Sequence, residues 1–106
     1  MGLAFKENCP DVRNTKVVDV VSELESYGAN VDVHDPWVDP QDAISEYGIE
    51  LTESPRPDAY DVVLLAVAHD QFKGMGEEGI KTYGKPESVY FDIKYLLPAE
   101  ASDGRL

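Results

Sequence analysis

The first part of the chain with residues suited to binding a ligand is the stretch GLAFKENCPDVRNTK, residues 2–16. It places an aromatic ring at Phe5, an ammonium group at Lys6 and a guanidinium group at Arg13. A lysine holds a phosphate as a mobile point charge, and an arginine forms paired hydrogen bonds with a carboxylate or a phosphate. An aromatic ring beside them provides an apolar wall or a face for a base. These residue types indicate a site for an anionic, nucleotide-like ligand.

The stretch lacks the glycines with which a dinucleotide-binding turn approaches a pyrophosphate. Such a turn contains G-x-G-x-x-G, and an acidic residue follows at the end of the second strand, about 20 residues later. Gly2 is the only glycine before Gly28, and Asp35 comes 33 residues after Gly2. An anion bound here must therefore be held by side chains.

These side chains also have a purely structural interpretation. In that alternative Phe5 is a core residue, Lys6 is a solvated surface residue, and Arg13 pairs with Asp11. Spacing alone favours this structural interpretation. The charge distribution is compatible with a binding role, because the first 16 residues carry three basic and two acidic side chains, whereas the other 90 carry six and 19. The opening stretch is thus the least acidic part of the chain.

The composition excludes several other classes of function. A net charge of -12 over 106 residues repels nucleic acid and anionic membrane surfaces. The single cysteine forms no intrachain disulfide, no run of 18 apolar residues is present, and His34 and His69 stand apart from any metal-ligand cluster. We therefore expect a cytoplasmic domain without a bound metal.

Strand and helix patterns alternate along the sequence, and turn and capping residues separate them. The expected order is a strand at 2–5, a helix from Asn14 or Thr15 to Gly28, a strand at 30–35, a helix from Pro40 to Gly48, a brief strand at 49–51, a strand at 60–68, a helical turn at 70–72, a short helix at 77–83 and a strand at 88–97. The run at 60–68, YDVVLLAVA, is apolar on both faces and is expected to be a central strand.

This order predicts an α/β, Rossmann-like three-layer fold with a mostly parallel sheet of about five strands, as one domain over residues 1–106. Ligands of such sheets bind at the carboxyl ends of the strands, where residues 5–13 would lie. Only about four residues precede the charged loop, although a first strand is usually central. We therefore expect the chain to be a fragment of a longer protein.

Four segments resemble one known family. GLAFKENCPDVRNTKVVDVV, VDVHDPWV, AHDQFK and VYFDIKYLL are similar, in this order, to the C-terminal, UDP-binding domain of the UDP-glucose/GDP-mannose dehydrogenase family. The resemblance covers essentially the whole chain, and F-K-x-n-x-x-D-x-R is specific to that family. The form FKENCPDVRNTK most resembles the branch that oxidises UDP-N-acetylhexosamines.

The resemblance implies one domain of an NAD-dependent UDP-sugar 6-dehydrogenase that oxidises a UDP-hexose or UDP-N-acetylhexosamine at C6 to the uronate, for polysaccharide precursor synthesis. NAD would bind mainly to a domain absent from this chain, and the catalytic cysteine would lie in a preceding G-G-x-C motif. The chain alone should therefore be inactive. Its partners would be the UDP-sugar and the other domains, in a homodimer or a larger assembly. The alternative is a free-standing nucleotide-binding regulatory module without catalytic activity.

The resemblance also implies roles for individual residues. Phe5 and Lys6 match the pair that contacts the UDP-sugar, and Arg13 matches the arginine that reaches NAD across the domain interface. Asp11 matches the acid that would orient Arg13. FDIK occupies the place of F-D-G-R in many members, so Lys94 stands for a nucleotide-contacting arginine.

Two further residues invite a catalytic interpretation that the sequence does not support. Cys9 lies in NCPD, outside a G-G-x-C motif and without a neighbouring histidine to activate it. His69 ends the apolar run at 60–68 and is expected to cap the turn that follows. We expect no catalytic residue in this chain.

Overall fold

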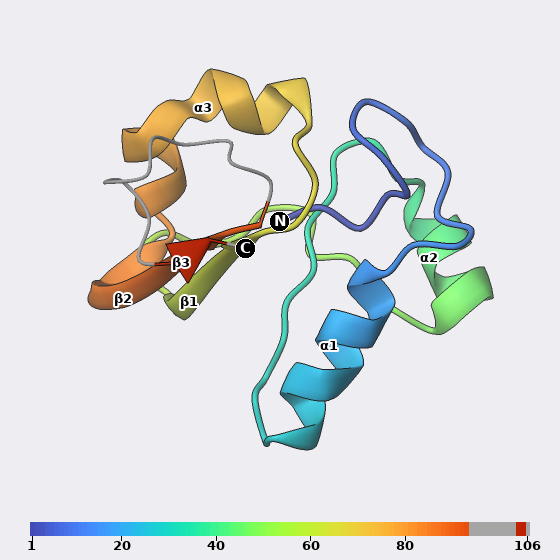
Figure 1. The fold of residues 1–106 in the computed structure, drawn as a ribbon, viewed down its shortest axis with the longest axis horizontal. Coiled ribbons are helices and arrows are strands. Elements are labelled where there is room, and N and C mark those ends of the chain that lie inside the picture. The colour runs from blue at the N-terminus through green and yellow to red at the C-terminus, as the bar shows by residue number, and fades with distance from the viewer. Residues whose placement is uncertain (94–103, 106) are drawn as a thin grey trace.

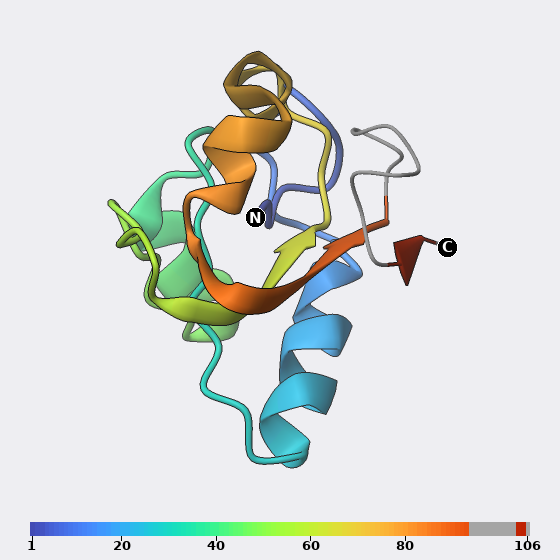
Figure 2. The ribbon, with the colours of Figure 1, turned by 90° about the vertical axis from the view of Figure 1, so that its left-hand side faces the viewer.

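A computed structural model describes residues 1–93 and 104–105 of the chain. Its elements are α1 (Val17–Ser26), α2 (Pro40–Tyr47), β1 (Tyr60–Leu65), α3 (Asp70–Lys81), β2 (Gly84–Asp92) and β3 (Gly104–Arg105). Figure 1 shows α1 and α3 on opposite sides of the strands, and the quarter turn in Figure 2 shows the same arrangement. The predicted α/β class with a parallel sheet is confirmed.

The sheet has the strand order β1-β2-β3, and both pairs are parallel. The regular part of the first pair runs from Val62 opposite Val89 to Leu65 opposite Asp92. The expected sheet of about five strands is not confirmed, because three strands form the sheet in the described part of the chain. β3 was not predicted, and a two-residue strand leaves no periodic pattern in a sequence.

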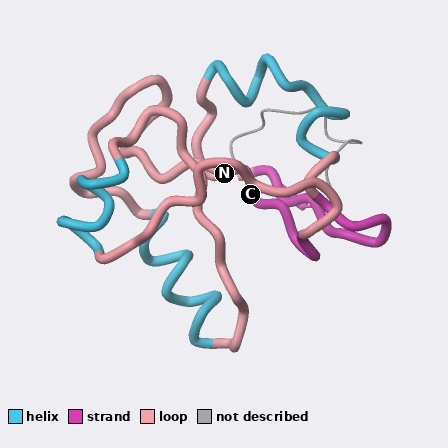
Figure 3. The backbone as a smooth tube through the Cα atoms, turned by 180° about the vertical axis from the view of Figure 1, so that it is seen from behind, coloured by secondary structure: helices cyan, strands magenta, loops and turns pink. Residues whose placement is uncertain are grey.

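The segments expected as strands at 2–5, 30–35 and 49–51 are extended loops (Figure 3). Backbone hydrogen bonds nevertheless connect them in parallel fashion. The N–H of Ala66 donates to the carbonyl of Met1 over 2.9 Å, and the N–H of Gly2 donates to the carbonyl of His34 over 2.8 Å. A parallel bridge then joins Val33 to Leu51. The first residues therefore lie between β1 and residues 33–34.

β1 was expected to be buried on both faces, and this expectation is wrong in part. Val63 and Leu65 are buried and pack with Ile80 of α3, whereas Val62 is 54% exposed and faces away from that cluster. Successive side chains of a strand point to opposite faces, and α3 covers one face only. The expected central position of β1 agrees better with the structure, because β2 pairs with one edge of β1 and Met1 is hydrogen-bonded to the other edge.

Local sequence signals determine the bounds of α2. Asp39 accepts a hydrogen bond from the N–H of Gln41 over 2.8 Å, so it caps the helix that Pro40 begins. Gly48 ends the helix with a φ of 67°, a left-handed conformation that glycine adopts without steric cost. The predicted start and end of this helix are confirmed.

Glycine also explains the shape of α3. The predicted division into a helical turn and a short helix corresponds to one helix that is interrupted at Gly76, where φ is 66° and ψ is -178°. The helix buries Phe72 before the interruption and Ile80 after it. One position therefore redirects the chain while both halves keep contact with the interior.

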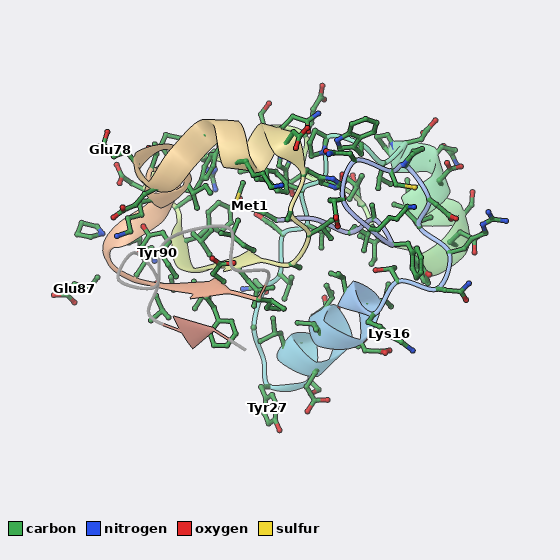
Figure 4. All side chains as sticks on the ribbon, turned by 45° about the horizontal axis from the view of Figure 1, so that its top comes forward. Met1, Lys16, Tyr27, Glu78, Glu87 and Tyr90 are labelled. Carbon is green, nitrogen blue, oxygen red and sulfur yellow. The ribbon has the colours of Figure 1, made fainter. Side chains whose placement is uncertain are left out.

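The interior consists of two groups of buried side chains. The first includes Leu3, Val21, Val33 and Ala43 and joins the N-terminal segment to α1 and α2. The second lies between α3 and the strands. Met1 lies near the middle of the molecule, whereas Tyr27 projects beyond the end of α1 and is 81% exposed (Figure 4). The loop at residues 5–13 is anchored in the first group, which contains Ala4 before it and Val12 near its end.

Candidate functional site

Asp35 is the buried anchor of the loop at residues 5–13. Its Oδ2 atom accepts hydrogen bonds from the N–H groups of Leu3 and Ala4, over 2.7 and 2.9 Å. The same atom lies 2.9 Å from Nε2 of His69, and Oδ1 accepts the N–H of Trp37. Burial acts to raise the pKa of Asp35, but these hydrogen bonds outweigh it and lower that pKa below its ordinary value.

The occupied backbone groups limit how this turn can bind an anion. In a glycine-rich turn, free N–H groups point at the phosphate. Here the N–H groups of Leu3 and Ala4 point inward to Asp35, so they are not available to a ligand. The expectation that side chains hold the anion stays a prediction.

Gly2 serves packing at the start of this turn. Its φ is 102°, and a Cβ atom on it would lie 2.6 Å from Cβ of Val67. Any other residue would therefore clash with β1's continuation and adopt a strained backbone. The one glycine of the stretch is needed for close approach of two segments.

His69 connects this anchor to the tip of the loop. The ring is 0% exposed, and its Nδ1 atom accepts the N–H of Asn8 over 2.9 Å. Because Nδ1 accepts, the proton of the neutral ring is on Nε2, from which it is donated to Asp35. In return, Oδ1 of Asn8 accepts the N–H of Asp70 over 2.9 Å.

This geometry corrects the expected role of His69 as a turn cap. His69 occupies the position before α3, but its side chain forms no capping hydrogen bond. The side chain that satisfies the N–H of Asp70 comes from Asn8, 62 residues away in sequence. Asn8 has a φ of 54°, which asparagine tolerates better than most residues.

Asp11 and Arg13 form the ion pair that the sequence indicated. Nε of Arg13 lies 3.0 Å from Oδ1 of Asp11, and Nη2 lies 3.2 Å from Oδ2. The hydrogen bonds from the side chain and the backbone of Arg13 lower the pKa of Asp11. The Arg13 side chain is 74% exposed, so solvent screens the pair and its contribution to stability is small. This contact fits both the structural alternative and an orienting role for Asp11.

Phe5 and Lys6 project from the same loop without being absorbed into the core. Phe5 is 56% exposed, so its interpretation as a core residue is wrong. Lys6 is exposed and forms no ion pair among the described residues. The N–H of Phe5 donates to the carbonyl of Asp11 over 2.7 Å and closes the base of the loop. Lys94, the third expected ligand contact, lies outside the described residues.

A hollow of about 370 Å³ separates the far side of the loop from α2. Its lining includes Asp11 and Arg13 from the loop and Asp42 and Glu46 from α2. The acidic side chains make this hollow unfavourable for a phosphate.

The pairing of Asp35 with His69 was not predicted from the sequence. Asp35 and His69 each lie at the carboxyl end of a predicted strand, at 30–35 and 60–68, and the carboxyl ends of parallel strands meet at one edge of a sheet. That shared position was a signal that the two side chains could meet. Cys9, in the same loop, is half-buried.

The described residues contain neither a metal-binding cluster nor a helix that could cross a membrane. No group of three or more histidine, cysteine, aspartate or glutamate side chains in that part of the chain could hold a metal ion. None of the helices there has the length and apolar character needed to cross a membrane.

The structure is an α/β domain with a parallel sheet and a glycine-free loop at residues 5–13, on which the side chains of Phe5 and Lys6 are exposed. Residues 1–99 match the model of the UDP binding domain of the UDP-glucose/GDP-mannose dehydrogenase family. The chain belongs to this family, which confirms the resemblance seen in its motifs.

Individual relatives agree with this assignment. The chain is 58% identical to the UDP-N-acetyl-D-glucosamine 6-dehydrogenase of Pseudomonas aeruginosa and 51% identical to that of Salmonella typhi, in each case over 100% of the chain and 25% of the relative. It is 39% identical to protein CapL of Staphylococcus aureus, over 94% of the chain and 23% of that protein. The chain thus spans about a quarter of the length of these relatives.

Proposed function

We propose that this chain is the UDP-sugar-binding domain of an NAD-dependent nucleotide-sugar 6-dehydrogenase that acts on a UDP-N-acetylhexosamine. The observation that carries the proposal is the match over the whole chain, at 58% and 51% identity, to two proteins named UDP-N-acetyl-D-glucosamine 6-dehydrogenase. The geometry of the opening loop supports it, because the side chains of Phe5 and Lys6 are exposed and Lys6 forms no ion pair in the described part of the chain. The complete enzyme would act in the cytoplasm as a homodimer or a larger assembly.

Lys6 would bind the diphosphate of the ligand, and Phe5 would form the adjoining apolar wall. An anion that approaches a chain of net charge -12 meets an unfavourable average field, so binding needs positive charge at short range. The N–H groups of Leu3 and Ala4 are already bonded to Asp35, and Lys6 provides the first positively charged side chain after them. By the family motif, Lys94 would provide a second positive charge for the nucleotide.

Arg13 would contribute one contact to NAD, which supplies the hydride acceptor when it is bound. The chain has no glycine-rich fingerprint for the cofactor, so most of that site would belong to another part of the protein. Asp11 occupies Nε and one edge of Nη2, which leaves Nη1 free to donate outward. Asp11 would therefore orient Arg13 toward the cofactor. None of the residues of this chain would act as a nucleophile.

The hydrogen bonds of the N-terminal half support a larger sheet in the longer protein. Backbone hydrogen bonds place the extended segments side by side in the order Leu51, Val33, Gly2 and β1. β2 and β3 follow on the other edge of β1. We propose that these extended segments become regular strands of one doubly wound sheet, as in a Rossmann-like domain. The loop at residues 5–13 then lies at its carboxyl edge, where the strand order reverses.

The experiment that tests this function compares two lengths of the protein. The longer protein that contains this chain should reduce NAD in the presence of UDP-N-acetylglucosamine, and the 106-residue chain should not. UDP-glucose and GDP-mannose serve as alternative substrates and test the choice of nucleotide and sugar. Absence of NAD reduction with every nucleotide sugar, while UDP still binds, would instead favour a regulatory nucleotide-binding module.

A further inference from the structure

We propose that His69 is a positioning residue for the ligand-binding loop and that it acts through its Nδ1 atom on the backbone of Asn8. This inference rests on the proposed function of Lys6 as the phosphate ligand. His69 touches no ligand in this account. It fixes the segment from which Lys6 projects, two residues before Asn8.

The ring of His69 has a fixed orientation and a fixed tautomer. Its side chain is 0% exposed, so water cannot replace either of its hydrogen bonds without opening the interior. Asp35 lies at Nε2 and the Asn8 N–H lies at Nδ1, each at 2.9 Å. The rings of Phe72 and Trp37 flank the imidazole, with centroids 5.5 and 6.2 Å away.

The loop depends on this contact at its tip. Its base is closed by the bond from the Phe5 N–H to the Asp11 carbonyl. Among the described contacts, the tip is held by the two bonds of Asn8, one to His69 and one to Asp70. A fixed tip reduces the conformational entropy that the loop would lose when Lys6 binds a phosphate. His69 should therefore affect ligand affinity without touching the ligand.

Two variants of His69 distinguish the hydrogen bond at Nδ1 from the hydrogen bond at Nε2. An asparagine side chain places an acceptor near the position of Nδ1, and a glutamine side chain places a donor near the position of Nε2. His69→Asn can therefore keep the bond to the Asn8 N–H and loses the bond to Asp35, whereas His69→Gln does the reverse. Both variants remove the buried ring, so each serves as the packing control for the other.

The experiment is a titration of UDP into the isotope-labelled 106-residue chain, followed by amide chemical shifts. His69→Gln should weaken UDP binding about three- to tenfold, as expected for loss of one neutral hydrogen bond. His69→Asn should bind within about twofold of the wild type. A purely structural role predicts equal losses in both variants, in proportion to their loss of stability, and that result would overturn the inference.

A second measurement on the unmodified chain needs no variant to fold. The ring nitrogens of His69 should show Nε2 protonated and Nδ1 unprotonated, and the Asn8 amide should exchange more slowly than the Glu7 amide. A proton on Nδ1, or an Asn8 amide that exchanges as fast as Glu7, would overturn the inference. Lys6→Ala separates the two proposals: if it weakens UDP binding and His69→Gln does not, only the positioning role fails. If Lys6→Ala binds UDP as the wild type does, the proposed function of Lys6 fails, and the inference falls with it.

Discussion

Nε2 of His69 lies 2.9 Å from Oδ2 of Asp35, and both side chains are completely buried. The two residues are 34 positions apart and end two different extended segments. Because the same Asp35 oxygen also accepts two N–H groups of the N-terminal segment, this contact links three parts of the chain. The opening loop is therefore attached to the interior at its start and, through His69, at its tip.

Replacement of Asp35 should test how much this attachment stabilises the fold. Asp35→Ala leaves the N–H groups of Leu3 and Ala4 and the ring of His69 without an acceptor. Each buried unsatisfied group costs about 1–3 kcal/mol, so the free energy of unfolding should fall by about 3 kcal/mol or more. Urea denaturation measures this loss.

Asp35→Asn is the matched control because it keeps the shape and one acceptor oxygen. It should lose less stability than Asp35→Ala, because its oxygen can still accept from Leu3, Ala4 and His69, although its NH2 group then faces the N–H of Trp37. A change below about 1 kcal/mol for Asp35→Ala would show that water satisfies these groups and that Asp35 is not an anchor.

The amino group of Met1 should make the stability of this chain depend on pH. Desolvation by burial lowers the pKa of this group from 8.0 to about 6, against the opposing effect of the charge on Asp35. The folded state thus binds fewer protons than the unfolded state between these values. Stability should be full above pH 8 and should fall by about 2–3 kcal/mol as the pH drops through 6.

Acetylation of the N-terminus provides the control for this effect. The acetylated chain has no amino group to titrate, so its stability should change less between pH 8 and 6, as measured by urea denaturation at several pH values. Identical pH profiles for the free and acetylated chains would show that the amino group is solvated in the folded state.

Arg13 should affect the cofactor more than the nucleotide sugar in the longer protein. Loss of one charged hydrogen bond costs about 1.5–3 kcal/mol, so Arg13→Ala should raise the KM for NAD about tenfold or more. The KM for the UDP-sugar should change less. Steady-state kinetics with each substrate varied in turn measure both values.

Asp11→Asn distinguishes orientation from charge at the same site. It keeps Arg13 but weakens the ion pair that directs it, so the KM for NAD should rise less than in Arg13→Ala. Unchanged NAD kinetics in a folded Arg13→Ala protein would assign the pair of Asp11 and Arg13 to a structural role alone.

Features that depend on neighbours in sequence were predictable. Asp39, Pro40 and Gly48 determine α2 because capping and chain reversal act within a few residues. Gly76 likewise interrupts α3 where the sequence indicated two helical pieces. Each of these signals is local, so its outcome does not depend on the rest of the fold.

Features that depend on contacts across the fold were not predictable in the same way. Val62 is exposed because α3 covers only the other face of the sheet. An apolar run such as residues 60–68 does not show which of its faces a helix will cover. The bond from Asn8 to His69 joins residues 61 positions apart. The ligand roles of Phe5, Lys6 and Lys94 came from the family motif, because spacing alone also allowed a structural interpretation.

The most direct test of the central claim is the affinity of Lys6→Ala for UDP. Lys16→Ala is the matched control, because it removes the same charge from the same stretch at the start of α1 (Figure 4). In an amide-shift titration of the 106-residue chain, wild-type shifts should cluster at Phe5 and Lys6. Lys6→Ala should weaken binding by about 1.5–3 kcal/mol, and Lys16→Ala should change it little. Equal affinity of Lys6→Ala and the wild type, in a folded protein, would contradict the account.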